Sequence, residues 1–139
     1  EAQRLGIPVF GVCLGLQGMV EFLGGQLDLL PHPVHGKPAT VRTVTGGGRL
    51  LAGLPETFEV GRYHSLYASL ADVPAELMVT AHTDDGVVMA AEHRHRPLAG
   101  VQFHPESVMT ARGDAGHRIM ANVMSWAAEV SRAGQLRRT

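Results

Sequence analysis

The sequence predicts an α/β fold, with an open, mixed β-sheet and flanking helices. Three features favour this class: a buried strand that turns sharply into a helix within Ile7–Gly25, a middle section of short strands joined by turns, and an amphipathic helix near the C-terminus. Such a mixture is typical of α/β proteins. With 139 residues the chain has room for one hydrophobic core but not for two, so we expect a single domain over residues 1–139.

The N-terminal unit is expected to consist of a strand, a tight elbow and a helix. Pro8–Val12 is a short apolar run between turn-forming residues, as in a buried strand. Leu14–Leu23 carries apolar side chains at helical spacing, and two glycines follow that would end the helix. Between them, Gly11-Val12-Cys13-Leu14-Gly15 matches the Gly-x-nucleophile-x-Gly pattern of a strand-to-helix elbow.

This setting predicts that Cys13 is a nucleophile. Its sulfur would lie at the N-terminus of the helix, where the partial positive charge favours the thiolate over the thiol. The backbone N–H of Leu14 would point to the same place and help to hold an oxyanion. The alternative is a buried structural cysteine, which is the commoner fate of an isolated cysteine.

The remaining elements follow from composition and turn signals. Strands are expected at Gln26–Leu30, Ala39–Val44, Phe58–Val60, Leu77–His82, Val87–Glu92 and Leu98–Phe103. Loops or turns are expected at residues 31–38, 46–48, 84–86 and after Thr110, with one helical turn at Leu50–Leu54. The closing helix is expected over Ala115–Val130 with Asp114 as its N-cap. Residues 1–6 resemble the end of a helix already under way, and residues 137–139 a frayed tail.

Composition excludes several kinds of protein. The net charge is -1 with neutral histidines, so no basic face favours nucleic-acid binding. No apolar run is as long as a membrane span. The single cysteine rules out an internal disulfide framework and suits a reducing compartment, so we expect a cytoplasmic location.

A thiolate nucleophile needs a base, and His104 is the favoured candidate among the eight histidines. It follows a predicted buried strand, at the strand end where α/β proteins gather their functional groups. Glu106 lies two residues on and faces the same way in extended structure, so it can orient the imidazole. Cys13, His104 and Glu106 together form a hypothetical Cys-His-Glu triad.

Two further groups of polar residues remain open on the residues alone. Gln17 follows Cys13 by four positions and lies over the same helix face, where it could bond an amide or simply be a helical polar group. The end of the strand at Tyr63–Leu66 has free backbone groups that could receive an amino acid. A metal site at His82, His93 and His95 is not favoured, because two arginines lie among these histidines.

The motifs together resemble the class I (triad) glutamine amidotransferase domain. The resemblance rests on Gly11-Val-Cys-Leu-Gly-Leu-Gln17, Arg62-Tyr-His-Ser-Leu66 and Gly100-Val-Gln-Phe-His-Pro-Glu-Ser107, in this order, and runs to about Val130. It implies a flavodoxin-like open mixed sheet. Within the family the chain is most similar to the glutaminase domain of anthranilate synthases in their fused form.

The resemblance also implies an activity. Cys13, His104 and Glu106 match the catalytic positions, while Leu14, Gln17 and the backbone of Ser65 and Leu66 match positions that hold glutamine. Glutamine would be hydrolysed through a γ-glutamyl thioester, and ammonia would pass to a chorismate-using synthase for anthranilate, and hence tryptophan, synthesis. No cofactor or metal is implied in this domain, whereas Mg is expected in the partner.

Two departures from the family pattern and several rivals stay open. Leu16 stands where the family commonly has histidine, and the family's first strands, with a glycine-rich oxyanion loop, are expected to be absent from these residues. The rivals are the glutaminase of para-aminobenzoate synthesis, that of guanylate or carbamoyl phosphate synthesis, a non-catalytic docking module, and a hydrolase of γ-glutamyl peptides.

Overall fold

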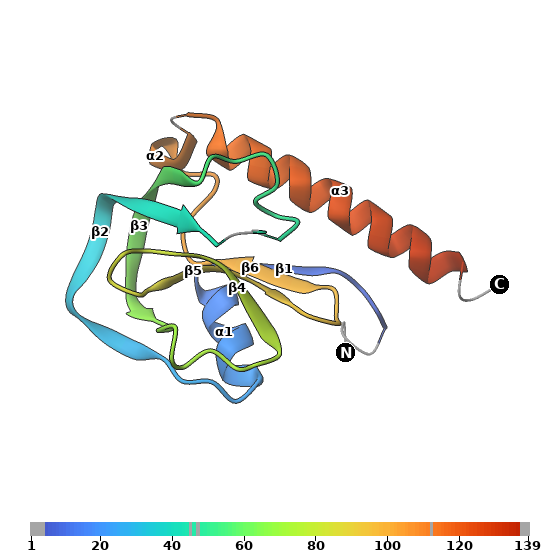
Figure 1. Cartoon of the computed structure of the whole chain (residues 1–139), viewed down its shortest axis with the longest axis horizontal. Helices are drawn as coiled ribbons and strands as arrows, with labels where there is room; N and C mark the ends of the chain where they lie inside the picture. Colours follow the sequence, from blue (N-terminus) through green and yellow to red (C-terminus); the bar gives the residue numbers. More distant parts are fainter. Residues whose placement is uncertain (1–4, 45, 47, 112, 137–139) are drawn as a thin grey trace.

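The computed structural model describes residues 5–44, 46, 48–111 and 113–136 (Figure 1). Their strands form one six-stranded sheet in the order β1-β6-β5-β4-β2-β3. The elements are β1 (Val9–Val12), α1 (Leu14–Phe22), β2 (Asp28–Thr43), β3 (Thr57–Tyr67), β4 (Leu77–His82), β5 (Val88–His93), β6 (Leu98–Val101), α2 (Val108–Ala111) and α3 (Ala115–Leu136). The open mixed sheet and the flanking helices confirm the predicted fold class.

The sheet is parallel at one place, between β1 and β6, and antiparallel in its other pairs. The parallel register places Val12 opposite Val101. The two strands therefore end side by side, and the segments that follow them begin at the same edge of the sheet. Gly100 permits this close pairing, because a Cβ there would lie 2.7 Å from the backbone oxygen of Gly11.

The two long helices cover opposite faces of the sheet (Figure 1). On one face Leu16 and Val20 of α1 pack in a cluster with side chains of β4 and β5. On the other face Ile119 and Trp126 of α3 join a larger cluster that includes Phe103. Each helix thus buries an apolar stripe against the sheet, as the helical spacing of these residues predicts.

Two local predictions were wrong, and one short helix was not predicted. The expected loop at residues 31–38 belongs to the long strand β2, which pairs with β3 through two breaks in register. Leu50–Leu54 forms turns with i-to-i+3 backbone bonds rather than a helical turn. The short helix α2 was not predicted, since a loop was expected only after Thr110.

Most of the other expected elements lie within a few residues of their predicted bounds. The strands expected at Gln26–Leu30 and Ala39–Val44 are, however, parts of the single strand β2, and β3 continues seven residues beyond the predicted Val60. The strand Leu77–His82 agrees at both ends, and the turn at residues 84–86 connects β4 to β5. α3 continues six residues beyond the predicted Val130. The predictions for residues 1–4 and 137–139, and part of the turn at 46–48, lie outside the described residues. None of the described helices is both long and apolar enough to cross a membrane.

Candidate active site

Cys13 occupies a strained elbow between β1 and α1. Its φ of 53° and ψ of -102° lie in a region that side-chain-bearing residues rarely adopt. The elbow is fixed on both sides, since the Cys13 N–H donates to the Val101 carbonyl at 2.8 Å and the Cys13 carbonyl accepts from the Gln17 N–H at 3.2 Å. Cys13 is the N-cap of α1 and partly exposed, and its side chain makes no capping hydrogen bond to the first helical turn.

The glycines of the motif make room for this elbow. A Cβ on Gly11 would lie 2.7 Å from the backbone carbonyl carbon of Gly15 and equally close to Met19. The strand and the helix can approach one another only because this position has no side chain.

His104 lies at the same edge of the sheet, three residues after the end of β6. Its Nδ1 is 2.7 Å from Oε1 of Glu106. A carboxylate only accepts hydrogen bonds, so Nδ1 carries the proton and Nε2 is left free to accept one. The edge of the Tyr63 ring packs against the imidazole, with centroids 5.9 Å apart and planes at 88°. The imidazole is thus held by β3 as well as by Glu106.

The pKa of Glu106 is displaced by this contact. Partial burial by itself raises the pKa of a carboxyl group, but three other effects outweigh it here: the hydrogen bond with His104, a backbone hydrogen bond and the charge of the imidazole. Together they hold the pKa of Glu106 below its ordinary value. Glu106 therefore stays ionised, as the residue that orients a base must.

α3 supports the segment that carries His104 and Glu106. Gly116 lies in the first turn of α3, and a Cβ there would collide with the backbone carbonyl oxygen of Pro105. The helix start therefore sits directly against the peptide between the two functional side chains.

Gln17 connects the helix to the end of β3. Its Nε2 donates to the Leu66 carbonyl at 2.9 Å and to Oε1 of Gln102 at 3.1 Å. Gln102, only 1% exposed, in turn donates from Nε2 to the Cys13 sulfur at 3.5 Å. Three segments that are far apart in sequence thus share one chain of hydrogen bonds: the start of α1 with Cys13 and Gln17, the end of β3 with Leu66, and Gln102 after β6.

A buried Arg–His pair holds the end of β3. Arg62 Nε donates to Nε2 of His64 at 3.1 Å, and Nδ1 of His64 lies 2.8 Å from the Leu66 carbonyl. Burial has the largest effect and lowers the pKa of His64, whereas the hydrogen bond to the Leu66 carbonyl raises it by less. The charge of Arg62 lowers the pKa and that of Asp85 raises it, and the pKa remains below its ordinary value. The imidazole is therefore neutral near neutral pH. Nη2 of Arg62 is buried and has no hydrogen-bond partner among the described residues.

The structure thus brings most of the sequence-predicted residues to one region. Cys13 and His104 follow neighbouring parallel strands, Glu106 is bonded to His104, and Gln17 is bonded to the backbone of Leu66. Leu14 opens α1, so its N–H has no acceptor within the helix. Ser65 precedes Leu66 in β3, and its backbone is part of the same strand end. The chemical roles of these residues remain predictions.

The roles of Gln102 and His64 in the site were not predicted from the sequence. Both stood within the quoted motifs, but neither was proposed as a site residue. Gln102 precedes His104 by two positions, and a polar residue at the end of an apolar strand is a signal that could have drawn attention to it.

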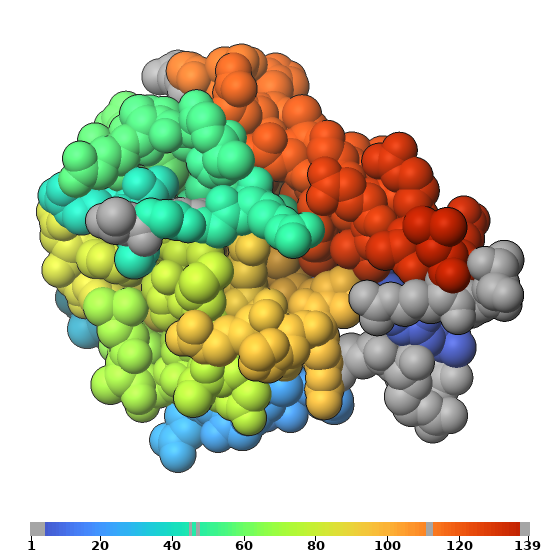
Figure 2. Space-filling view, turned by 45° about the vertical axis from the view of Figure 1, so that its right-hand side comes forward, coloured from blue at the N-terminus to red at the C-terminus, as the bar shows by residue number. Residues whose placement is uncertain are grey.

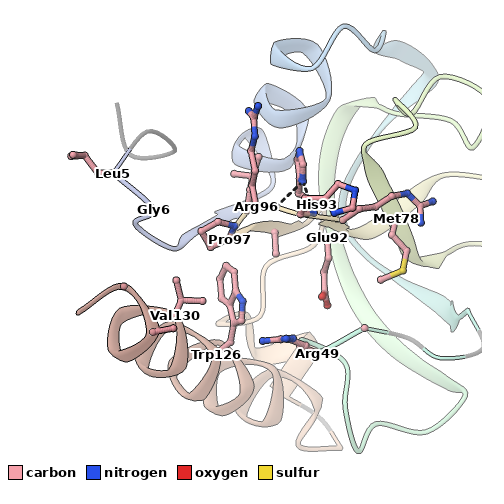
Figure 3. Close-up of a pocket in the computed structure, with 17 residues that line it drawn as sticks. Leu5, Gly6, Arg49, Met78, Glu92, His93, Arg96, Pro97, Trp126 and Val130 are labelled. Atoms are coloured by element: carbon pink, nitrogen blue, oxygen red, sulfur yellow. Dashed lines mark hydrogen bonds between the residues drawn. The ribbon is translucent and has the colours of Figure 1, made fainter. Parts of the chain in front are cut away.

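A cavity of about 990 Å³ lies at the opposite end of β1 and β6. Trp126 and Val130 of α3 form one wall of it, and Pro97 with its neighbours forms the other (Figure 3). In the space-filling view α3 (red) runs beside this part of the chain (Figure 2). The cavity borders the residues that precede the two strands, whereas Cys13 and His104 follow them, so it is not part of the site described above.

Comparison with known proteins identifies the family. A family model described as class-I glutamine amidotransferase matches residues 1–123. The chain belongs to the class-I glutamine amidotransferases. The match covers all of the motifs that form the site, and the resemblance seen in the sequence is therefore confirmed.

Relatives of this amidotransferase include an anthranilate synthase and an aminodeoxychorismate synthase. It is 63% identical over 123 residues to an anthranilate synthase of Azospirillum brasilense, covering 88% of this chain and 16% of that protein. It is 49% identical over 116 residues to an aminodeoxychorismate synthase of Streptomyces griseus, covering 84% and 15%. The chain therefore spans about a sixth of the length of these two relatives.

A solved structure supports the fold. A glutamine amidotransferase from Thermotoga maritima superimposes with a TM-score of 0.66 at 17% identity, over 98% of this chain and 60% of that one. At this identity the likeness shows the shared fold alone.

Proposed function

We propose that this chain is the glutamine-hydrolysing domain of an anthranilate synthase, with Cys13, His104 and Glu106 as its catalytic triad. The observation that carries the proposal is the His104–Glu106 pair at 2.7 Å, at the sheet edge where the strained Cys13 elbow also lies. The 63% identity to an anthranilate synthase supports the choice of product.

The reaction follows from the chemistry of these groups. The Cys13 sulfur attacks the side-chain amide carbon of glutamine, and the N–H of Leu14 donates to the oxyanion that forms. Nε2 of His104 takes up the proton of the Cys13 thiol and passes it to the amide nitrogen, which leaves as ammonia while the γ-glutamyl thioester forms. Water, deprotonated by the same imidazole, then releases glutamate and restores the thiol. Glu106 holds Nδ1 of His104 throughout.

Glutamine is expected to be held at the strand end that faces α1. Gln17 offers its side chain, and the backbone of Ser65 and Leu66 offers donors and acceptors along an extended edge. These groups suit the amino-acid end of a substrate, whose ammonium and carboxylate need fixed polar partners.

The ammonia is proposed to pass to a chorismate-using synthase, whether fused to this chain or separate. In this account the domain itself needs no cofactor or metal, the Mg expected in the partner serves chorismate chemistry, and the protein acts in the cytoplasm. A second candidate product is aminodeoxychorismate, the precursor of para-aminobenzoate, and the 49% identity to an aminodeoxychorismate synthase favours it.

A substitution of the nucleophile in the whole protein, with its synthase partner present, tests the proposal. Cys13→Ser should abolish product formation from glutamine and chorismate, and should leave formation from ammonium salts and chorismate intact. The identity of the product, anthranilate or aminodeoxychorismate, separates the two candidates. Loss of both the glutamine-dependent and the ammonia-dependent reactions would contradict the role of this chain as the ammonia donor.

A further inference from the structure

The buried side-chain amide of Gln102 lies between Gln17 and Cys13, two residues that are expected to contact glutamine. Its Oε1 accepts from Nε2 of Gln17 at 3.1 Å, and its Nε2 donates to the sulfur of Cys13 at 3.5 Å. The side chain is 1% exposed, so water does not compete for either end. A buried amide that is bonded at both ends has one defined orientation.

The backbone carbonyl of Leu66 sets that orientation. This oxygen can only accept, so Gln17 must turn its Nε2 toward it, as the 2.9 Å contact requires. Nε2 has a second hydrogen, which points to Gln102, and Gln102 must meet it with its oxygen. The only group that Gln102 then has left for the sulfur of Cys13 is a donor.

The carbonyl of Leu66 is itself fixed from the other side. Arg62 can only donate, so Nε2 of His64 must accept from it, and the proton of the imidazole lies on Nδ1. Nδ1–H then donates to the Leu66 carbonyl at 2.8 Å. Arg62 can only donate and the Leu66 carbonyl can only accept. Together they determine the direction of every hydrogen bond in the series from Arg62 to Cys13.

We propose that Gln102 is a positioning residue that holds a hydrogen-bond donor against the Cys13 sulfur and locks the side chain of Gln17. A donor interacts more strongly with a negatively charged acceptor than with a neutral one, so this contact favours the thiolate over the thiol. The inference deepens the proposed glutaminase function and rests on it, since it is there that the sulfur acts as nucleophile.

Two substitutions of Gln102 distinguish the role of its Nε2 donor from the role of its Oε1 acceptor. Gln102→Glu keeps the size and an oxygen that accepts from Gln17, but replaces the donor at the sulfur with a carboxylate oxygen. We expect kcat for glutamine hydrolysis to fall roughly tenfold or more, while KM changes by less than about threefold. Gln102→Met removes both bonds, and should raise KM as well because Gln17 is released. The exposed Gln26 provides a matched control, and Gln26→Glu should change neither constant.

A second measurement follows the reactivity of the Cys13 sulfur in the absence of glutamine. The rate of alkylation of Cys13 by iodoacetamide at neutral pH, followed by mass spectrometry of its peptide in the whole protein, depends on the thiolate population. It should be about threefold slower or more in both Gln102 variants, since a larger thiolate fraction outweighs the lower reactivity of a stabilised thiolate. Melting temperatures of the variants show that the comparison is made on folded protein.

The outcomes distinguish this inference from the proposed function. Folded Gln102 variants with unchanged alkylation rates would overturn the donor role, whatever their glutaminase activity. If Gln102→Glu and Gln102→Met changed kcat and KM in the same proportions, the proposed division of roles between Nε2 and Oε1 of Gln102 would be overturned. A wild-type protein without glutaminase activity, but with slowed alkylation in the variants, would refute the proposed function and leave the contact between Gln102 and the sulfur supported.

Discussion

The imidazole of His104 and the carboxylate of Glu106 have different tasks, and their substitution should have unequal effects. The imidazole moves protons, whereas the carboxylate, which is 66% exposed, only orients it. His104→Ala should therefore lower kcat roughly a hundred- to ten-thousand-fold, the range expected for loss of a general acid–base. Glu106→Gln should lower kcat by clearly less, because the amide oxygen can still accept from Nδ1.

The chain offers a matched control for this comparison. His117 and Asp114 form another histidine–carboxylate pair, at 3.2 Å, but both side chains are more than two-thirds exposed and lie outside the site. His117→Ala and Asp114→Asn should leave the steady-state rate of glutamine hydrolysis unchanged. Equal loss of activity in His104→Ala and Glu106→Gln would refute the division of roles.

His64 should make folding stability depend on pH. Its folded-state pKa is lowered from 6.5, chiefly by burial, so the unfolded chain takes up a proton first on acidification. The free energy of unfolding should therefore fall as the pH drops from 6.5 through the folded-state value. Below that value this group contributes no further change. Urea unfolding over a pH series measures the effect.

The matching variant is His64→Gln, whose side chain cannot take up a proton. It should show a flatter pH dependence of the unfolding free energy over the same window. The same slope in wild-type protein and variant would mean that other groups cause the effect.

The residues of the site differ in how visible they are in the sequence. Cys13, His104 and Glu106 stand in motifs whose residue types are needed for the chemistry, so they could be predicted. Gln102 and His64 act through hydrogen bonds to residues 89 and 2 positions away, respectively. The first of these contacts depends on the register of β1 with β6, which no local pattern in the sequence specifies.

At the scale of elements, the start of α3 is the support on which the His104–Glu106 segment rests. Gly116→Ala would drive a methyl group into the Pro105 carbonyl, so the helix and this segment must separate. We expect a loss of roughly 1–3 kcal/mol in stability and a fall in kcat, since the imidazole moves with Pro105.

Gly134 is a control in the same helix. A Cβ at this position meets nothing within 4 Å, so Gly134→Ala should stabilise the helix by up to about 1 kcal/mol and leave kcat unchanged. Thermal unfolding and steady-state kinetics of the two variants provide the comparison. A Gly116→Ala variant with wild-type kcat would show that α3 does not position the catalytic segment.

The elements that the sequence did not predict have a physical explanation. Residues 31–38 contain three prolines and read as a loop, because proline cannot donate to a β-ladder. In the structure β2 pairs with β4 only at Arg42 and Thr43, so most of the edge of β2 that faces away from β3 needs no hydrogen-bond donors. In the pairing of β2 with β3, a break in register between Leu29 and Val34 spans two of the prolines. Tertiary context, rather than local propensity, makes this segment a strand.

At the scale of the whole molecule, the site depends on segments from nearly the full length of the chain. The nucleophile follows β1, the base follows β6, the hydrogen-bonded carbonyl lies near the end of β3, and α3 closes the arrangement from the other face (Figure 1). The fold class could be predicted from the sequence because strand and helix periods are local. The assembly of the site could be inferred only because it lies where parallel strands end together.

The central claim is that Cys13 is the nucleophile of a working glutaminase. The most direct test is to treat the whole protein, with its synthase partner and chorismate present, with the glutamine-mimicking electrophile 6-diazo-5-oxonorleucine, and to map the adduct by mass spectrometry. We predict one adduct on Cys13, together with loss of glutamine-dependent but not of ammonia-dependent product. An unlabelled Cys13 under these conditions would contradict the account and favour a docking module without glutaminase chemistry.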